Sequence, residues 1–179
     1  MRQLVQSVRD GSLSLIEGPR PSITSTQVLV DTRVSLISSG TERHIRRLAK
    51  SSLVAKARAR PDLVRKVVQK ARTDGLVESY TAVRNRLSEH MPLGYSAAGV
   101  AIEVGEAVVG IRPGQRVATA GAGHGDLQVS AGNLTAPIPE KVGFDDASFG
   151  AVASIALHGL RLAEIGPADR IVVVGLGLV

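Results

Sequence analysis

The last residues of the sequence contain a glycine pattern that could bind a phosphate group. The segment RIVVVGLGLV (170–179) has the composition of an apolar strand that runs into a turn at Gly175 and Gly177. A dinucleotide-binding unit begins in this way, with Gly-x-Gly-x-x-Gly between a buried strand and a helix whose N-terminus holds a pyrophosphate. The third glycine would follow Val179, so these residues alone cannot complete the site. Either the chain is part of a longer nucleotide-binding protein, or the segment is an ordinary buried strand that reaches a turn.

Thiol and metal chemistry have few candidate residues in this sequence. The chain has no cysteine, which excludes disulfides, thiolate nucleophiles and thiolate zinc sites. Its four histidines are far apart and form no His-x-x-x-His pair: His44, His90, His124 and His158. A bound metal ion is therefore not expected.

Positive charge is concentrated in one segment of the chain, whose net charge is +6. Residues 43–72 contain a single acid, Asp62, among many bases: Arg43, Arg46, Arg47, Lys50, Lys56, Arg58, Arg60, Arg65, Lys66, Lys70 and Arg72. Such a cluster suits nucleic acid, a phosphate-bearing ligand or an acidic partner. The same pattern also describes the solvated face of ordinary helices, so both interpretations stay open.

Period-two alternation predicts a β domain on both sides of this basic segment. Residues 27–37 and 97–105 alternate apolar and polar side chains, as half-buried strands do. The Pro113-Gly114 pair predicts a turn, and short strands broken by glycine and proline follow it. Most of 1–40 and 94–140 is therefore expected to be β structure, in short strands as in a barrel-like domain.

Helical periodicity appears in the middle and near the end of the chain. Residues 61–72 and 75–87 each have an apolar stripe, and a third helix is expected before them, so 43–88 is predicted to be a helical insertion. Residues 144–166 predict one or two helices with acids near the start, where the helix dipole favours them. A strand at 171–174 follows. This order, β domain, helices and then a glycine turn, is that of a two-domain dehydrogenase.

The motif GYSAAGVAIEVGEAVVGIRPGQRVA (94–118) resembles the signature of the medium-chain dehydrogenase/reductase superfamily. The segments SLISSGTER (35–43), IPEKVGFDDASF (138–149) and the terminal glycine turn follow in the family's order. The resemblance implies an α+β chain with a GroES-like β-barrel catalytic domain over 1–143 and the first strand of a truncated Rossmann (α/β) domain within 144–179. The basic insertion is further similar to that of bi-domain oxidoreductases.

Three departures from the zinc-dependent branch of that family are visible in the sequence. Ser39 stands where a ligand cysteine is found, and Gly94-Tyr95-Ser96 replaces Gly-His-Glu. The third ligand position falls near Gly150, and the structural zinc lobe has no counterpart without cysteine. Serine and tyrosine do not replace thiolate and imidazole as zinc ligands, so the resemblance implies a zinc-free relative.

The resemblance also assigns a proton relay to Thr41 and His44, which occupy the family's hydroxyl and histidine positions. A hydroxyl can pass a proton and an imidazole can exchange it with solvent near neutral pH. Alternatively, Thr41 caps a helix that begins near Glu42, and His44 is one more polar residue on a basic helix.

The resemblance places Tyr95 in the substrate cleft, where its phenol could donate a hydrogen bond to a carbonyl or only pack against its neighbours. His124 and His158 are interpreted as structural or solvent-facing residues, without a catalytic role. The implied cofactor is NAD or NADP, and Gly175 and Gly177 are the implied cofactor-binding residues.

These observations favour the N-terminal part of a nicotinamide-dependent oxidoreductase that transfers hydride to or from a carbonyl, alcohol or activated alkene without zinc. The expected partner is a small-molecule substrate, and a homo-oligomer stays open. The alternative is a non-enzymatic GroES-like module whose basic helices dock nucleic acid or an acidic protein. Nucleic acid is not expected, because the few aromatic residues do not interleave with the basic segment. No long apolar run or leader is present, so a cytoplasmic location is expected. Alone, residues 1–179 are expected to be inactive and to bind neither cofactor.

Overall fold

The computed structural model describes residues 1–51, 58, 61, 65, 69, 90–121 and 123–179. The helices expected at 61–72 and 75–87 lie outside the described residues, apart from single helical positions at Pro61, Arg65 and Gln69. The chain divides into two compact units. One comprises Met1–Gln3, Ile16–Ser38 and Leu93–Val179, and the other comprises Leu4–Leu15 and Ser39–Pro92.

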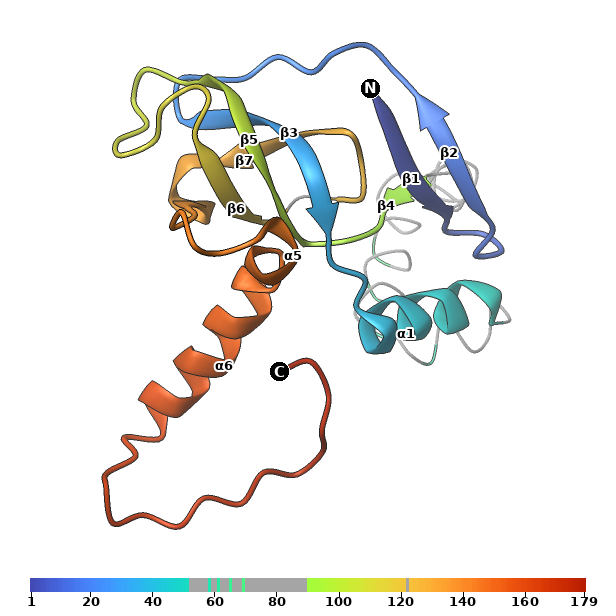
Figure 1. Cartoon of the computed structure of the whole chain (residues 1–179). Coiled ribbons are helices and arrows are strands. Elements are labelled where there is room, and N and C mark those ends of the chain that lie inside the picture. The colour runs from blue at the N-terminus through green and yellow to red at the C-terminus, as the bar shows by residue number, and fades with distance from the viewer. Residues whose placement is uncertain (52–57, 59–60, 62–64, 66–68, 70–89, 122) are drawn as a thin grey trace. The chain divides into compact units, whose positions relative to one another are not determined.

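The first unit is built on an antiparallel five-stranded sheet with the order β7-β3-β5-β6-β8 (Figure 1). Its strands are β3 (Gln27–Ser35), β5 (Ser96–Val104), β6 (Arg116–Ala120), β7 (Leu127–Ala131) and β8 (Thr135–Pro137). A 3-10 turn, η1 (Gly132–Leu134), joins the last two. The strands expected from period-two alternation are therefore confirmed, and Gly114 adopts the φ of +83° that the predicted Pro-Gly turn requires.

The core of this unit lies where β3, β5 and β6 meet, around Val28, Val30, Ala101, Ile111 and Val117. β3 was expected to bury one face only. In its N-terminal part this is wrong, because Leu29 on one face is as fully buried as Val28 and Val30 on the other. β3 lies between β5 and β7, and the sheet curls around it (Figure 1). Both faces of the strand are therefore excluded from water at this point.

Two helices follow the sheet, as the sequence predicts for 144–166. They are α5 (Phe144–Ala147), with Asp145 and Asp146 in its first turn, and α6 (Gly150–Leu162). The Arg116 guanidinium lies 4.6 Å from the centre of the Phe144 ring, a cation–π contact between β6 and α5. Ser96 donates its hydroxyl to the Ser148 carbonyl and so ties β5 to the junction of the two helices.

The second unit contains most of a three-stranded sheet with the order β2-β1-β4 and the helix α1. The strands are β1 (Arg2–Ser7), β2 (Leu13–Glu17) and β4 (His90–Pro92), and α1 spans Ser39–Lys50. In the turn between β1 and β2, Ser12 donates its backbone N–H and its hydroxyl to the Asp10 carboxylate. These bonds lower the pKa of Asp10 to about 2. The carboxylate that holds this turn is therefore ionised at any pH well above that value.

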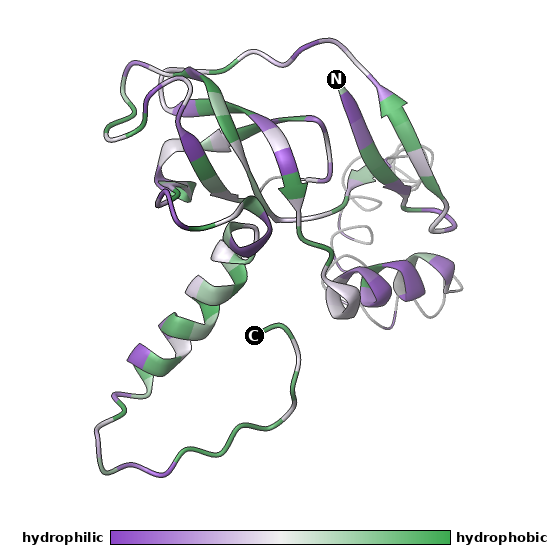
Figure 2. Ribbon diagram, in the orientation of Figure 1, coloured by the Kyte–Doolittle hydropathy of each residue, from purple (hydrophilic) through white to green (hydrophobic). Residues whose placement is uncertain are grey.

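The strand expected at Ile171–Val174 is not formed. The segment makes no strand pairing among the described residues, and its side chains are exposed, Val174 by 95%. A β-strand needs hydrogen bonds to neighbouring strands, and a continuous run of apolar residues does not supply them. Figure 2 shows that this tail and α6 are rich in hydrophobic residues, and Leu157 and Leu160 of α6 are exposed.

Deleting residues 170–179 is expected to increase the soluble, monodisperse fraction of the protein. The deletion removes an exposed run of β-branched and leucine side chains, which is prone to associate edge to edge. Light scattering of the two proteins at equal concentration measures the effect. A Val172→Lys/Val174→Lys variant is the matched control, because it breaks the apolar run at full length. Equal scattering from all three proteins would show that the tail does not drive association.

None of the helices among the described residues has both the length and the apolar character that crossing a membrane requires.

Candidate functional site

Thr41 and His44 lie together at the start of α1. The helix begins at Ser39, so Thr41 lies inside the first turn, and the interpretation of Thr41 as a cap of a helix starting near Glu42 is wrong. Residues three apart are neighbours on a helix surface, and both side chains are exposed. The two groups are therefore near one another and accessible to solvent, which a proton relay needs.

The C-terminal half of α1 is held by the turn between β1 and β2. Gly11 adopts a φ of +72°, and a Cβ built on it would lie 3.2 Å from the Arg46 carbonyl oxygen and 3.3 Å from the Ala49 Cβ. Ala49 is buried at this contact. A glycine lets the turn approach the helix closely, so the turn fixes the helix that carries Thr41 and His44.

Tyr95 belongs to the other compact unit and immediately precedes β5. Its carbonyl accepts a 2.7 Å hydrogen bond from the Gly121 N–H, and its side chain is half-buried. Gly94, the residue before it, has a φ of +91°. The backbone around Tyr95 is therefore defined by a glycine turn on one side and a strand on the other.

His124 is a buried residue next to this turn, which favours the structural over the solvent-facing interpretation of this histidine. Its Nδ1 lies 2.9 Å from Ser35 Oγ, and its backbone N–H donates to the Leu93 carbonyl at 2.6 Å. A Cβ on Gly94 would lie only 2.9 Å from the imidazole, so glycine is required there. Sequence reasoning missed Ser35 and could not connect it to His124, because 89 positions separate the two residues.

The two compact units divide the predicted site residues. Thr41 and His44 lie in the unit of α1, and Tyr95 lies in the unit of the five-stranded sheet with His124. The position of each residue is therefore described only within its own unit. A shared catalytic role for Thr41, His44 and Tyr95 stays a prediction.

The residues at the family's zinc positions do not fit a zinc ion. Ser39 and Tyr95 offer a hydroxyl and a phenol, and the chain has no thiolate. Near the third position, Gly150 has no side chain to offer, and a Cβ built there would lie 3.5 Å from the Ala118 Cβ. Within the described part of the chain, no three His, Asp or Glu side chains gather as a metal site would need.

The glycine turn at the end of the chain has one feature of a dinucleotide-binding loop. Gly175 has a φ of +90°, the left-handed conformation that a tight turn after a strand requires. A Cβ built on Gly175 or Gly177 would meet no atom within 4 Å, so this loop is open. Their role as the first two glycines of a pyrophosphate-binding turn stays a prediction.

Comparison with protein-family models gives no match, and no curated protein matches the sequence. The fold, however, is found in solved oxidoreductase structures. A quinone oxidoreductase from Coxiella burnetii superposes with a TM-score of 0.60 at 20% identity, over 94% of this chain and 47% of that one. A putative zinc-binding dehydrogenase from Clostridium scindens gives 0.62 at 20% identity, over 93% and 49%.

A third structure is the Escherichia coli quinone oxidoreductase in complex with NADPH. It gives a TM-score of 0.59 at 16% identity, over 89% of this chain and 40% of that one. The chain thus spans less than half the length of each of these three structures. The likeness covers nearly all of the chain and shows that it shares a fold with parts of these oxidoreductase structures.

Proposed function

We propose that this chain, which has the fold of the medium-chain dehydrogenases/reductases, is the N-terminal part of an NAD(P)-dependent oxidoreductase. The proposed reaction transfers a hydride to or from a carbonyl, alcohol or activated alkene, without catalytic zinc. The observation that carries the proposal is the structural match over 94% of the chain to a quinone oxidoreductase. A neighbour with bound NADPH supports a nicotinamide cofactor.

The nicotinamide cofactor would supply the hydride-transfer chemistry when bound. Gly175 and Gly177 would hold its pyrophosphate by close backbone approach. We assign the proton that accompanies the hydride to α1, because Thr41 and His44 are adjacent and exposed on it. The Thr41 hydroxyl would receive the proton from the substrate side or donate it there, and the His44 imidazole would exchange it with water.

Tyr95 would orient the substrate oxygen by donating a hydrogen bond from its phenol. The half-buried side chain and the fixed backbone around it support this role, because a hydrogen-bond donor acts best when its position is set before the substrate arrives. Ser35 and His124 would hold that position through the turn at Gly94.

We expect the purified protein to contain no stoichiometric zinc. Ser39, Tyr95 and Gly150 provide neither thiolate nor imidazole at the positions where zinc-dependent relatives bind the ion. Elemental analysis of protein purified without a histidine tag measures the metal content. A Ser39→Cys/Tyr95→His variant provides the matched control, since it restores two of the missing ligands. One equivalent of tightly held zinc in the unmodified protein would refute the ligand argument.

The proposed function is tested by cofactor oxidation in the whole oxidoreductase of which this chain is proposed to be the N-terminal part. After dialysis against a chelator, NADH or NADPH oxidation is followed with quinones, aldehydes and α,β-unsaturated ketones as acceptors. Turnover with at least one acceptor supports the proposal. No turnover by folded protein that also fails to bind either cofactor would contradict it.

A further inference from the structure

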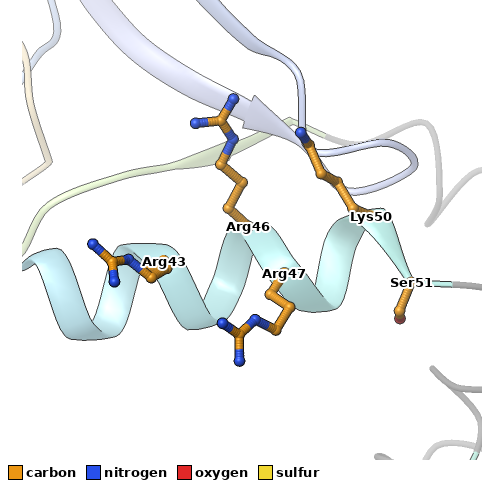
Figure 3. A pocket seen from close by; sticks show the side chains of 5 residues that line it. All are labelled: Arg43, Arg46, Arg47, Lys50 and Ser51. Carbon is orange, nitrogen blue, oxygen red and sulfur yellow. The ribbon is translucent and has the colours of Figure 1, made fainter.

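Four basic side chains form one face of α1, and we call this set the basic stripe: Arg43, Arg46, Arg47 and Lys50. Their spacing of three, four and seven residues puts all four on the same side of the helix. Each side chain is exposed, and none makes an ion pair with a described residue. Figure 3 looks onto this face of the helix, with Arg46 and Lys50 directed toward its upper edge, Arg47 toward its lower edge and Arg43 in front of the ribbon.

The basic stripe is unfavourable for the helix that carries it. Arg43 and Arg47 are separated by four residues, as are Arg46 and Lys50, and each like-charge pair costs about 0.2 to 0.5 kcal/mol. Arg47 and Lys50 lie in the last turn, where the helix dipole compensates them, but the other two do not. Glu42, the acid of this helix, precedes Arg46 by four residues and offsets one of the four charges at most. Helix stability therefore does not explain the stripe.

The four side chains and Ser51 line a surface hollow of about 610 Å³. Its described lining contains cations and a hydroxyl but no carboxylate. The hollow is wide open to solvent, so a ligand there would be held by charge rather than by enclosure. The guanidinium fork matches phosphate oxygens in a bidentate manner, and the stripe extends about 10 Å along the helix, which suits two or three linked phosphate groups.

Two other anionic partners fit the stripe less well. A membrane-binding helix needs a free apolar face, but Ala49 is buried against Gly11 and Ile45 is half-buried. Duplex nucleic acid is bound through roughly 6 to 10 phosphate contacts, more than a stripe of four cations on two helical turns provides. Single strands need aromatic stacking platforms, and α1 has no aromatic residue.

We propose that the basic stripe binds the linked phosphate groups of a small molecule, and that this molecule is the substrate of the oxidoreductase. Thr41 and His44 lie on the same helix within one turn of Arg43 but around the helix from the stripe, so a ligand anchored there would have to reach around α1 to present its reacting carbon near the relay. The second half of this inference rests on the proposed function. The binding of phosphate groups does not.

The test is a calorimetric titration of the 179-residue protein with pyrophosphate and tripolyphosphate at about 50 and 150 mM salt. We expect saturable binding with one ligand per chain, tighter for tripolyphosphate. Arg43→Gln/Arg47→Gln should weaken it by about 100-fold or more, because each of the two lost charge-assisted contacts costs about tenfold or more. The matched control, Arg112→Gln/Arg170→Gln, lowers the net charge equally at exposed positions of the other unit and should bind as the parent does.

Three results would overturn the site: no saturable binding, equal weakening in both double variants, or tighter binding of duplex DNA or anionic vesicles than of tripolyphosphate. Circular dichroism checks that α1 remains folded, which we expect because the substitutions remove like-charge repulsion. In the longer protein, tripolyphosphate should compete with the substrate and raise its apparent KM. Phosphate binding without any hydride transfer would leave the site intact and contradict the proposed function instead.

Discussion

Replacing His44 with glutamine in the full-length protein is expected to lower hydride-transfer turnover by about 10- to 1000-fold, while cofactor affinity changes little. Glutamine keeps a similar size and hydrogen-bonding capacity but cannot take up and release a proton. Removing a general acid or base typically lowers the reaction rate by about 10²- to 10⁴-fold. For a relay residue one step from the substrate, the loss of rate is expected to fall within or below that range. His44 is exposed on α1 beside Thr41, so its replacement should not disturb the fold.

The measurement is steady-state kcat across pH 6 to 9, with cofactor affinity determined separately. His158→Gln is the matched control, because His158 is an exposed histidine on α6. Added imidazole should restore part of the turnover of a His44→Ala variant, which a purely structural role would not predict. Unchanged turnover of His44→Gln over the whole pH range would reduce His44 to a surface residue.

Replacing Gly99 with alanine is expected to lower the free energy of unfolding by about 3 kcal/mol or more. Gly99 lies in β5 opposite Thr32 of β3, and a Cβ built on it would lie 2.2 Å from the Asp31 carbonyl oxygen and 2.9 Å from Val30 Cγ1. The first of these atoms belongs to the backbone of the paired strand. Relief therefore requires separation of β3 from β5, the central pair of the sheet, and overpacking of this kind is at the costly end of its range.

Thermal and denaturant unfolding of the 179-residue protein measure this effect, and a loss of about 10 °C in Tm is expected. Gly18→Ala is the matched control, because a Cβ there would meet no atom within 4 Å. An unfolding free energy of Gly99→Ala within 0.5 kcal/mol of the parent, roughly the range of ordinary surface substitutions, would show that the register of β3 and β5 is wrong.

Much of the first unit could be predicted because its signals are local. Alternation in 27–37 and 97–105 reflects the two faces of a strand, and the Pro113-Gly114 pair sets a turn through its own backbone preferences. The helices over 144–166 are likewise recognisable from small apolar residues and from acids at their start. These elements are present in the structure with boundaries shifted by only one or a few residues.

The remaining features depend on contacts between distant parts of the chain. Leu29 is buried on the second face of β3 because the sheet curls around it, and Ile171–Val174 lacks the neighbouring strands that would pair with it. The Ser35–His124 contact joins residues that no local pattern connects. The relay residues were predicted by resemblance, and the structure adds only that Thr41 and His44 are adjacent and exposed on one helix.

The most direct test of the central claim is a fluorescence titration of the longer, chelator-dialysed protein with NADH and NADPH. We expect saturable binding of at least one of them in the micromolar range with no zinc present, and no such binding to residues 1–179 alone. Absence of saturable binding of either cofactor to the longer, folded protein would contradict the assignment as a zinc-free nicotinamide-dependent oxidoreductase.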